Sequence, residues 1–386
     1  MRQPPRGITA GARGAATGAP DRRATFPAVT PAAARAWYAR QPWIVGCNYV
    51  PRTAANQLEM WQAETWRPDV IDEELAWAAA LGLNAVRVFL HDLPWRDDPA
   101  GFPARVDAFL ALCERHGLRA VPVLFDDCWG DDPRTGPQPR PRPGVHNSAW
   151  VQSPGTRAAA DRAQWPRLEA YVRGVARRYR DDARVLMWDV YNEVTNFFLP
   201  HLNRRQPLRA ALLAATMARR RLGANPTLDL ARAAFGWLRE EGVSQPLTAA
   251  SWYDEPWLNE RLYAWSDVVT FHHYGDRPSL EREIRGLLAR GRPVLCTEWL
   301  SRGPAGSEVA THLPAFREHG VGCFHWGLVD GRTQTKYGWG DRGGEAGGEP
   351  DVWFHDLLHA DGTPYRPGEA RMFRELTAAH PASTSA

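Results

Sequence analysis

The sequence predicts a (β/α)8 TIM barrel, an α/β fold in which eight parallel strands alternate with helices around a closed sheet. From about residue 30, eight short β-prone runs alternate with segments of helical, amphipathic periodicity. Several helical segments end in glycine directly before the next strand, as in LGLNAVRV, HGLRAVPV and HGVGCFHW. Eight such units in one chain of 386 residues favour a barrel over an open, doubly wound sheet.

The expected elements follow from these runs in order along the chain. The strands are WIVGCNY (43–49), AVRVFLH (85–91), AVPVLFD (120–126), VLMWDVYN (185–192), PLTAAS (246–251), VVTFHHY (268–274), PVLCTEW (293–299) and GCFHWGL (322–328). The helices between them are expected at 69–82, 102–117, 166–180, 228–242, 279–291 and 308–320. A dinucleotide-binding sheet would carry GxGxxG after the first strand, whereas this chain continues there as Gly-Cys-Asn-Tyr-Val-Pro.

Composition separates an N-terminal segment from the rest of the chain. We expect residues 1–28 to be a disordered extension and residues 29–386 to form a single barrel, because the first segment is rich in Gly, Ala, Pro and Arg. That segment holds five Arg and one Asp, so it accounts for +4 of the net charge of +3 and leaves the barrel near −1. We therefore expect no nucleic-acid partner. The oligomeric state stays open.

The location of the protein is predicted from what the chain lacks. No apolar run approaches the length of about 18–20 residues that a membrane helix needs, and no secretory signal is recognisable. The cysteine count is five, which is odd, and no CxxC pair occurs. We therefore expect a cytoplasmic protein with no membrane association, no disulfide framework and no zinc site.

Polar and aromatic residues recur where the expected strands end. In a (β/α)8 barrel, functional groups come from the C-terminal ends of the strands. Recurrence at nearly every strand end is poorly explained by independent core positions. The residues are Asn48 and Tyr49; Arg87, His91 and Asp92; Asp126, Asp127 and Trp129; Asn192 and Glu193; Trp252; His272, His273 and Tyr274; Glu298 and Trp299; and His325 and Trp326.

Glu193 and Glu298 are the pair that predicts a reaction. They end strands four and seven, which lie across a barrel mouth from each other. Two facing carboxyl groups suit glycoside hydrolysis, in which one protonates the leaving oxygen and the other attacks the anomeric carbon or activates water. A separation of about 5–5.5 Å means retention of configuration, and about 6.5–9.5 Å means inversion.

The residues resemble a known family at this point. Asn192-Glu193, His272-x-Tyr274, Glu298 in CTEW, Arg87 and Trp326 are similar to the motifs of clan A glycoside hydrolases, the four-seven barrel enzymes, and most resemble their cellulase-like family five group. The resemblance covers about residues 40–360. It implies a retaining enzyme in which Glu193 is the general acid and base and Glu298 the nucleophile.

The resemblance also implies roles for neighbouring residues. Arg87 and the Tyr274 hydroxyl would keep Glu298 ionised, while burial and the charge of Glu298 would raise the pKa of Glu193. Asn192 would hold a sugar 2-hydroxyl, and His272 would orient the acid or bind sugar. We further expect five strand-end residues to contact the substrate: Asn48, His91, Trp129, Trp299 and Trp326.

Some features depart from the family pattern or compete with the pair. Val194 stands where many relatives have proline after Asn-Glu, and strand three ends in Asp-Asp-Cys-Trp where cellulases often have histidine. The loop after strand one offers further sugar-contacting groups and two more acids, Glu59 and Glu64, that could compete for a catalytic role. Its candidates are Asn56, Gln57, Glu59, Trp61, Gln62 and Trp66.

The predicted function is a retaining β-glycoside hydrolase acting by double displacement on soluble oligosaccharides or glycosides, and long loops favour action at chain ends. Two alternatives stay open: a barrel of the same fold that binds carbohydrate without catalysis, and a phosphate-dependent isomerase or aldolase. The latter would need a lysine or a metal at a strand end, but Lys336 is the only lysine. Asp126, Asp127 and His91 could suggest a metal site, yet no paired histidine spacing supports one, so we expect neither metal nor cofactor.

Overall fold

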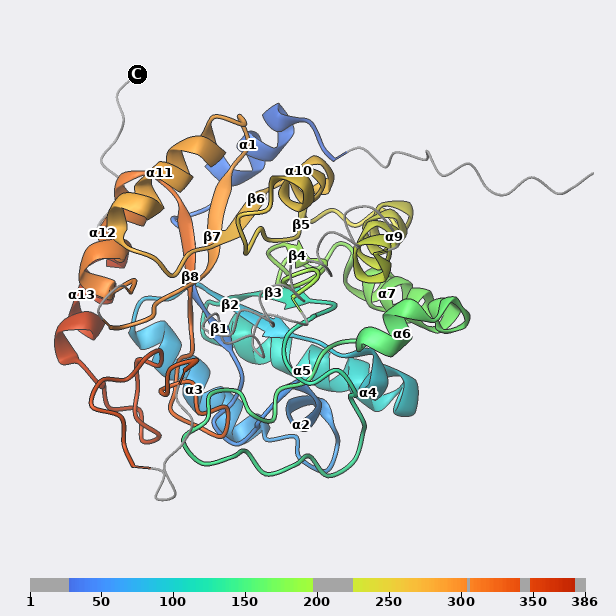
Figure 1. The fold of residues 1–386 in the computed structure, drawn as a ribbon, viewed down its shortest axis with the longest axis horizontal. Helices are drawn as coiled ribbons and strands as arrows, with labels where there is room; N and C mark the ends of the chain where they lie inside the picture. The colour runs from blue at the N-terminus through green and yellow to red at the C-terminus, as the bar shows by residue number, and fades with distance from the viewer. Residues whose placement is uncertain (1–27, 197–224, 304–305, 341–347, 379–386) are drawn as a thin grey trace, which may run out of the picture.

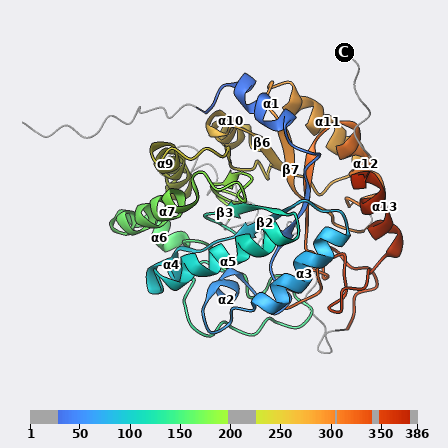
Figure 2. The same ribbon diagram turned by 180° about the vertical axis from the view of Figure 1, so that it is seen from behind.

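Eight parallel strands surrounded by helices form a (β/α)8 barrel, as Figures 1 and 2 show from opposite sides. The computed structural model describes residues 28–196, 225–303, 306–340 and 348–378. Almost all of the N-terminal segment expected to be disordered therefore lies outside the described residues. The predicted fold class is confirmed.

The strands pair in the order β5-β4-β3-β2-β1-β8-β7-β6. A parallel bridge between Ser251 and Phe271 joins the two ends of this order and closes the barrel. Each strand overlaps the run that predicted it, although the two-residue β4 and β5 are shorter than expected. The strands are β1 (Val45–Tyr49), β2 (Ala85–Phe89), β3 (Arg119–Val123), β4 (Trp188–Asp189), β5 (Leu247–Thr248), β6 (Val269–His272), β7 (Val294–Trp299) and β8 (Gly322–Trp326).

All six expected helices are present, and others lie in the loops between them. The expected ones are α3 (Pro68–Ala80), α5 (Gly101–Arg115), α7 (Trp165–Tyr179), α9 (Pro226–Glu240), α11 (Arg277–Leu288) and α12 (Val309–Glu318). The additional ones are α1 (Pro31–Ala39), α2 (Gln57–Trp61), α4 (Asp92–Asp97), α6 (Thr156–Ala160), the short 3-10 helix η1 (Arg162–Gln164), α10 (Pro256–Trp265) and α13 (Pro367–Ala378). Proline in the first turn starts several of them, where its missing N–H costs nothing.

The interior of the barrel changes from apolar to polar along the strands. One buried cluster joins apolar side chains from seven different strands or the residues beside them, among them Ala85, Leu295 and Phe324. Two residues further along β2, on the same side of the strand, Arg87 is also fully buried. An apolar layer therefore supports a polar layer at the C-terminal ends of the strands, where barrel enzymes hold their functional groups.

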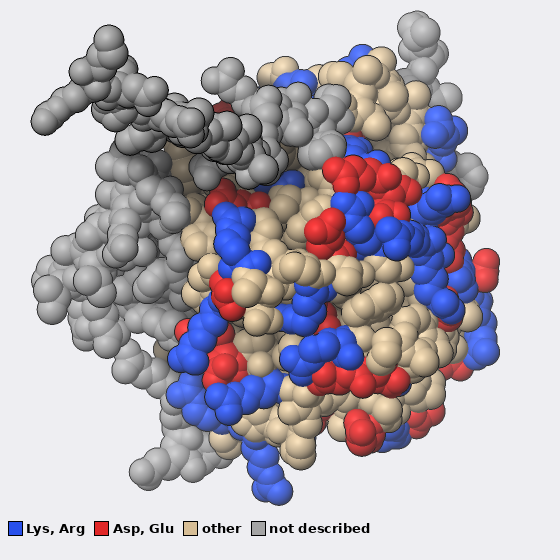
Figure 3. All heavy atoms as spheres, turned by 90° about the vertical axis from the view of Figure 1, so that its right-hand side faces the viewer, with Lys and Arg blue, Asp and Glu red and all other residues tan. Residues whose placement is uncertain are grey.

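The outer surface carries charges of both signs side by side. Figure 3 shows basic and acidic side chains interspersed on the face that carries α7 and α9. Arg173 on α7, for example, forms ion pairs with Glu169, Glu240 and Glu241. None of the helices that the structure describes has the length and apolar composition needed to span a bilayer.

Candidate active site

Arg87 organises the polar layer at the barrel mouth. Its guanidinium is fully buried and donates to Asp189 from Nε (2.9 Å), to Asn48 and Glu298 from Nη1 (2.6 and 2.9 Å) and to Asn192 from Nη2 (2.6 Å). Four polar side chains, on or just after the three strands β1, β4 and β7, thus bond one planar cation. A buried charge is tolerated only with such partners, so this network holds the side chains in one arrangement.

Glu298 lies on β7 with charged and phenolic donors on its carboxylate. Oε1 accepts from Arg87, and Oε2 accepts from the Tyr274 hydroxyl at 2.9 Å, while His272 Nδ1 lies 3.4 Å from Oε2. Regular alternation from Leu295, which points into the barrel, would turn Glu298 towards the helices. The pairing register of β7 shifts at this point against both β6 and β8, and the irregularity lets Glu298 reach the interior.

Glu193 follows β4 and has only uncharged partners. Oε1 lies 2.8 Å from Nδ1 of His272, and Oε2 accepts from the Cys128 thiol at 3.1 Å and from the Asn196 amide. Its backbone has a φ of 45°, and Thr195 has a φ of 76°. Non-glycine residues rarely adopt this left-handed region, at a cost of about 1–3 kcal/mol each, and such strain gathers at functional sites. The turn aims Glu193 back over the barrel.

The two glutamates meet at His272. One carboxylate oxygen of each glutamate and a ring nitrogen of His272 all lie within 4.8 Å of one another. Burial lowers the pKa of His272 to about 4, so the imidazole is neutral near pH 7. Its Nε2 is buried and has no hydrogen-bond partner among the described residues. His273 points the opposite way and bonds Glu283 on α11 at 2.8 Å, as alternation along a strand requires.

Burial disfavours the ionised form of both glutamates. Burial raises the pKa of Glu193, and burial together with the nearby Glu193 raises the pKa of Glu298 to about 7. Although burial acts strongly on Glu298, that carboxylate alone has direct guanidinium and phenol donors. We therefore assign the charge to Glu298 and the proton to Glu193, because hydrogen bonds from a cation favour the ionised form.

Among the described residues, Glu193, His272 and Glu298 are also the group of ligand-type side chains close enough to share a metal ion. The guanidinium of Arg87 already neutralises Glu298 at 2.9 Å. A second cation at this position would repel it in a buried environment. The three side chains are therefore better placed to bind and transfer a proton than to hold a metal ion. Asp126 and Asp127, considered above as ligands, accept instead from Trp150 and Tyr191.

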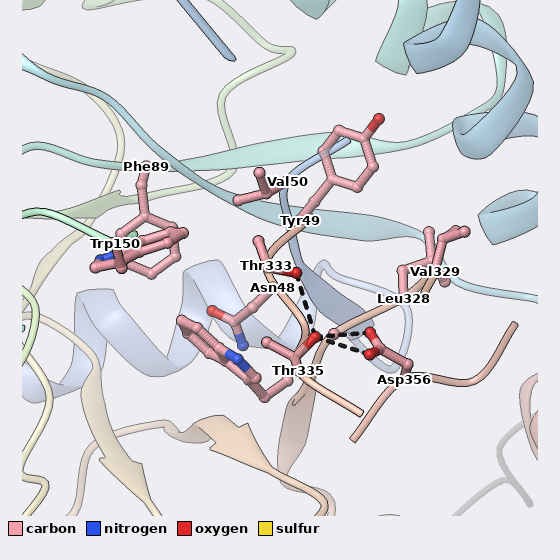
Figure 4. Close-up of a pocket in the computed structure, with 12 residues that line it drawn as sticks. Asn48, Tyr49, Val50, Phe89, Trp150, Leu328, Val329, Thr333, Thr335 and Asp356 are labelled. Atoms are coloured by element: carbon pink, nitrogen blue, oxygen red, sulfur yellow. Dashed lines mark hydrogen bonds between the residues drawn. The ribbon is translucent and has the colours of Figure 1, made fainter. Parts of the chain in front are cut away.

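The structure brings most of the predicted site residues together. Asn48 and Asn192 both accept from Arg87, and the Asn192 amide also donates to Asp126 at 3.0 Å. Trp326 is partly exposed and packs edge-on against Trp150 with ring centres 6.0 Å apart. It lines a small pocket that also borders Asn48 (Figure 4).

Three predicted contacts take other positions. Trp129 is partly exposed on the loop after β3 and packs against His146. His91 is fully buried, and its ring nitrogens bond the Gln152 carbonyl and the Leu93 amide. Trp299 is fully buried on the helix side of β7, against Phe316 of α12 and Phe373 of α13. The structure therefore does not bring His91 or Trp299 to the two glutamates.

The loop after β1 serves mainly as scaffold. Asn56, Gln57 and Gln62 hold the loop after β3 through side-chain hydrogen bonds, and Trp61 is fully buried. Glu59 pairs with Arg332 at 2.9 Å, and Glu64 is exposed. Neither acid lies beside the pair, so neither competes with it.

Sequence reasoning missed Cys128 and Asn196, which both contact Glu193. Burial raises the pKa of the Cys128 thiol well above its usual range, so the sulfur keeps its proton and donates it in a hydrogen bond. A signal for Cys128 was present in the Asp-Asp-Cys-Trp stretch, which directly follows the third expected strand. Asn196 had no comparable signal, because only the turn after Glu193 brings it close.

Known proteins resemble this chain in structure and not in sequence. No protein-family model matches the chain, and no curated protein is similar to it. Among solved structures, the exo-β-1,4-mannosidase Op5Man5 from Opitutaceae bacterium strain TAV5 is 19% identical with a TM-score of 0.57, covering 86% of this chain and 59% of its own. This chain thus spans less than two thirds of that protein.

Two further structures have comparable similarity. An endo-β-1,4-mannanase from Thermotoga petrophila is 14% identical with a TM-score of 0.53, covering 88% of this chain and 77% of its own. A GH5_18 protein from Streptomyces cattleya, solved in complex with GlcNAc, is 17% identical with a TM-score of 0.54, covering 89% and 82%. The chain therefore shares its barrel fold with these three solved structures, at low sequence identity.

Proposed function

We propose that the protein is a retaining β-glycoside hydrolase that acts on soluble oligosaccharides or glycosides, with Glu298 as nucleophile and Glu193 as general acid and base. The observation that carries the proposal is the approach of the two carboxylates, whose nearest oxygens lie within 4.8 Å of each other. This spacing suits the retaining class, at about 5–5.5 Å, and leaves no room for the water that an inverting enzyme places between its carboxylates.

In the first half of the reaction, Glu298 attacks the anomeric carbon while Glu193 gives its proton to the leaving oxygen. The bond from that carbon to the leaving oxygen breaks as the ester to Glu298 forms. Arg87 and Tyr274 orient the nucleophile through both of its oxygens. Because the attacking carboxylate is already held in one orientation, less entropy is lost when the reacting groups reach the transition state.

In the second half of the reaction, Glu193 changes from general acid to general base. The charge of Glu298 disappears in the ester, so ionised Glu193 loses its like-charged neighbour and serves as base towards a water. That water attacks the same carbon, and the released carboxylate regains its hydrogen bonds from Arg87 and Tyr274. His272 lies within 3.4 Å of both glutamates and stays neutral, so it bridges them without supplying charge.

A screen of aryl β-glycosides carrying gluco, manno, galacto and xylo sugars tests the proposal. We expect one or more to be hydrolysed, with the first-formed sugar in the β configuration by proton NMR, and no hydrolysis by Glu298→Gln. First-formed α sugar would contradict retention. Sugar binding without hydrolysis, and without covalent labelling of Glu298 by a mechanism-based inhibitor, would instead favour the non-catalytic carbohydrate-binding barrel.

A further inference from the structure

The turn that carries Glu193 adopts a backbone conformation that its residues disfavour. Glu193 has a φ of 45° and Thr195 a φ of 76°, and neither residue is glycine. Left-handed backbone at such positions persists only where the surrounding structure holds it in place. A turn with two such positions therefore needs partners, and the direction of the Glu193 side chain depends on them.

Asp127, on the loop after β3, bonds both ends of this turn. Its Oδ1 accepts from the Tyr191 hydroxyl at 2.7 Å, and its Oδ2 accepts from the Thr195 N–H at 2.7 Å. Glu193 lies between these two donors in the chain, so one carboxyl group spans the turn. Asp127 and Tyr191 are both buried, which shields the two bonds from water. We call this pair of bonds the Asp127 clamp.

The backbone of Asp127 is itself held in place. Its N–H donates to the Asn192 carbonyl at 3.3 Å, and its carbonyl accepts from the Gln152 amide at 2.9 Å. Gln152 is fully buried. The carboxyl group of Asp127 is therefore attached to a fixed part of the β3 loop, and the clamp ties the turn after β4 to that loop.

Trp252, on the loop after β5, holds the same turn from the other neighbouring strand. Its indole N–H donates to the carbonyl of Val194, the residue between the two left-handed positions, at 3.0 Å. Because β4 pairs with β3 on one side and with β5 on the other, the turn is bonded from both of its neighbours. The backbone of Glu193 is thus fixed separately from its side chain, which Cys128 and Asn196 contact.

The Asp127 clamp depends on hydrogen-bonding capacity and not on charge. Burial raises the pKa of Asp127 to about 7, although hydrogen bonds from Tyr191 and Thr195 act to lower it. A protonated carboxyl group still accepts from the Thr195 N–H on one oxygen, and its other oxygen can donate to the Tyr191 hydroxyl oxygen. An asparagine side chain offers the same acceptor and the same donor, so it should preserve the clamp.

We propose that Asp127 is a positioning residue for the general acid and base. Through Tyr191 and Thr195 it fixes the left-handed turn, and this keeps the Glu193 carboxyl group 2.8 Å from Nδ1 of His272 and facing the nucleophile. Asp127 acts on Glu193 through the backbone of the turn. The inference rests on the proposed function, because it takes Glu193 as the acid.

Asp127→Ala removes the clamp, and its effect should depend on the leaving group. A displacement of about 1 Å can cost about a hundredfold in rate, so we expect kcat for alkyl glycosides, whose leaving oxygen needs a proton, to fall by about ten- to a hundredfold. Labelling of Glu298 by a mechanism-based inhibitor whose leaving group needs no proton should stay within about threefold of the parent rate. Equal losses in both measurements would show that Asp127 only stabilises the fold.

Two milder variants test the clamp without emptying the site. Asp127→Asn should keep kcat for alkyl glycosides within about threefold of the parent protein, because its amide replaces both bonds. Tyr191→Phe removes one of the two bonds and keeps the buried ring, so it should lose about two- to fivefold with the same dependence on the leaving group. If Asp127→Ala does not fold, Tyr191→Phe decides, and an unchanged kcat for alkyl glycosides in that variant would contradict the clamp. A loss in Asp127→Asn as large as that in Asp127→Ala would contradict it as well.

Asp182→Ala is the matched control. Asp182 holds the turn at the opposite end of the same strand, where it accepts from the Arg184 N–H at 2.9 Å. Its alanine variant should leave the ratio of alkyl glycoside hydrolysis to Glu298 labelling unchanged. The same shift of that ratio in Asp182→Ala would overturn the specific role of Asp127. Absence of all Glu298-dependent hydrolysis in the parent protein would overturn the proposed function together with this inference, whereas normal hydrolysis by Asp127→Ala would overturn this inference alone.

Discussion

Glu298 and Glu193 lie within reach of the same imidazole, yet their surroundings differ in kind. Glu298 accepts from a guanidinium and a phenol, and its side chain is 6% exposed. Glu193 accepts from a thiol and an amide, and its side chain is 13% exposed. Burial raises the pKa of both carboxyls.

This difference teaches how one residue type takes two roles. Burial alone would leave the glutamates equivalent, so the division of work comes from their donors. A cation held 2.9 Å from Glu298 favours its ionised form, whereas the neutral partners of Glu193 let it keep a proton. Substitutions that alter the donors of one glutamate should therefore change one limb of the pH profile and leave the other.

The largest effect is expected at Glu298. Glu298→Gln keeps the shape and removes the nucleophile, so kcat should fall by about a thousandfold or more for every glycoside that the protein hydrolyses. Steady-state kinetics with an aryl glycoside measure this loss. A variant with more than a tenth of the original kcat would show that the attacking group lies elsewhere.

Glu193→Gln should cause the second-largest loss of activity, and the loss should depend on the leaving group. Loss of a general acid costs about 10²–10⁴-fold when the departing alcohol needs a proton. An activated nitrophenol leaves without one, so formation of the glycosyl ester should be nearly normal and its breakdown slow. Stopped-flow measurements should show a burst of released phenol followed by slow turnover. Equal losses for phenols of all acidities would contradict the assignment.

Arg87→Met removes the donor that distinguishes the two sites. Without it, Asp189 and Glu298 would be buried without a cation, which should lower the free energy of unfolding by about 3–5 kcal/mol. The pKa of Glu298 should rise further, so the acidic limb of kcat/KM should move to higher pH. Chemical denaturation and a pH profile measure both. Arg87→Lys keeps the charge, so its loss of stability and its shift of the acidic limb should both be smaller. If the Lys variant behaves as the Met variant does, the positive charge is not what stabilises the site.

The smallest effect is expected at Cys128. Its thiol donates to Glu193, which lowers the pKa of that carboxyl. Removing the donor in Cys128→Ala should raise that pKa by up to about one unit, so Glu193 stays protonated and the alkaline limb moves to higher pH. Cys128→Ser keeps a donor and should leave the limb near its original position. Identical profiles for Ala and Ser variants would show that the thiol only fills space.

Much of this arrangement could be predicted from local pattern. All eight strands overlap the apolar runs that predicted them, and the predicted glutamates meet in space. Trp299 shows where pattern fails. It follows Glu298 directly, and composition alone gives no reason to place an indole beside a catalytic candidate on the outside of the barrel. Adjacent strand residues point to opposite faces, and the register shift in β7 lets Glu298, rather than Trp299, face the interior. Such irregularities depend on the pairing of neighbouring strands.

The sequence by itself determined the alternation of strands and helices and the residues at the strand ends, because periodicity and turn chemistry act over a few neighbouring residues. The resemblance already implied Arg87 and Tyr274 as partners of Glu298, whereas only the tertiary structure decided that Cys128 and Asn196 reach Glu193 and which loops bond across the mouth. Cys128 and Glu193 are 65 positions apart, and Arg87 and Glu298 are 211 apart. Contacts over such separations depend on barrel closure, which no local pattern encodes.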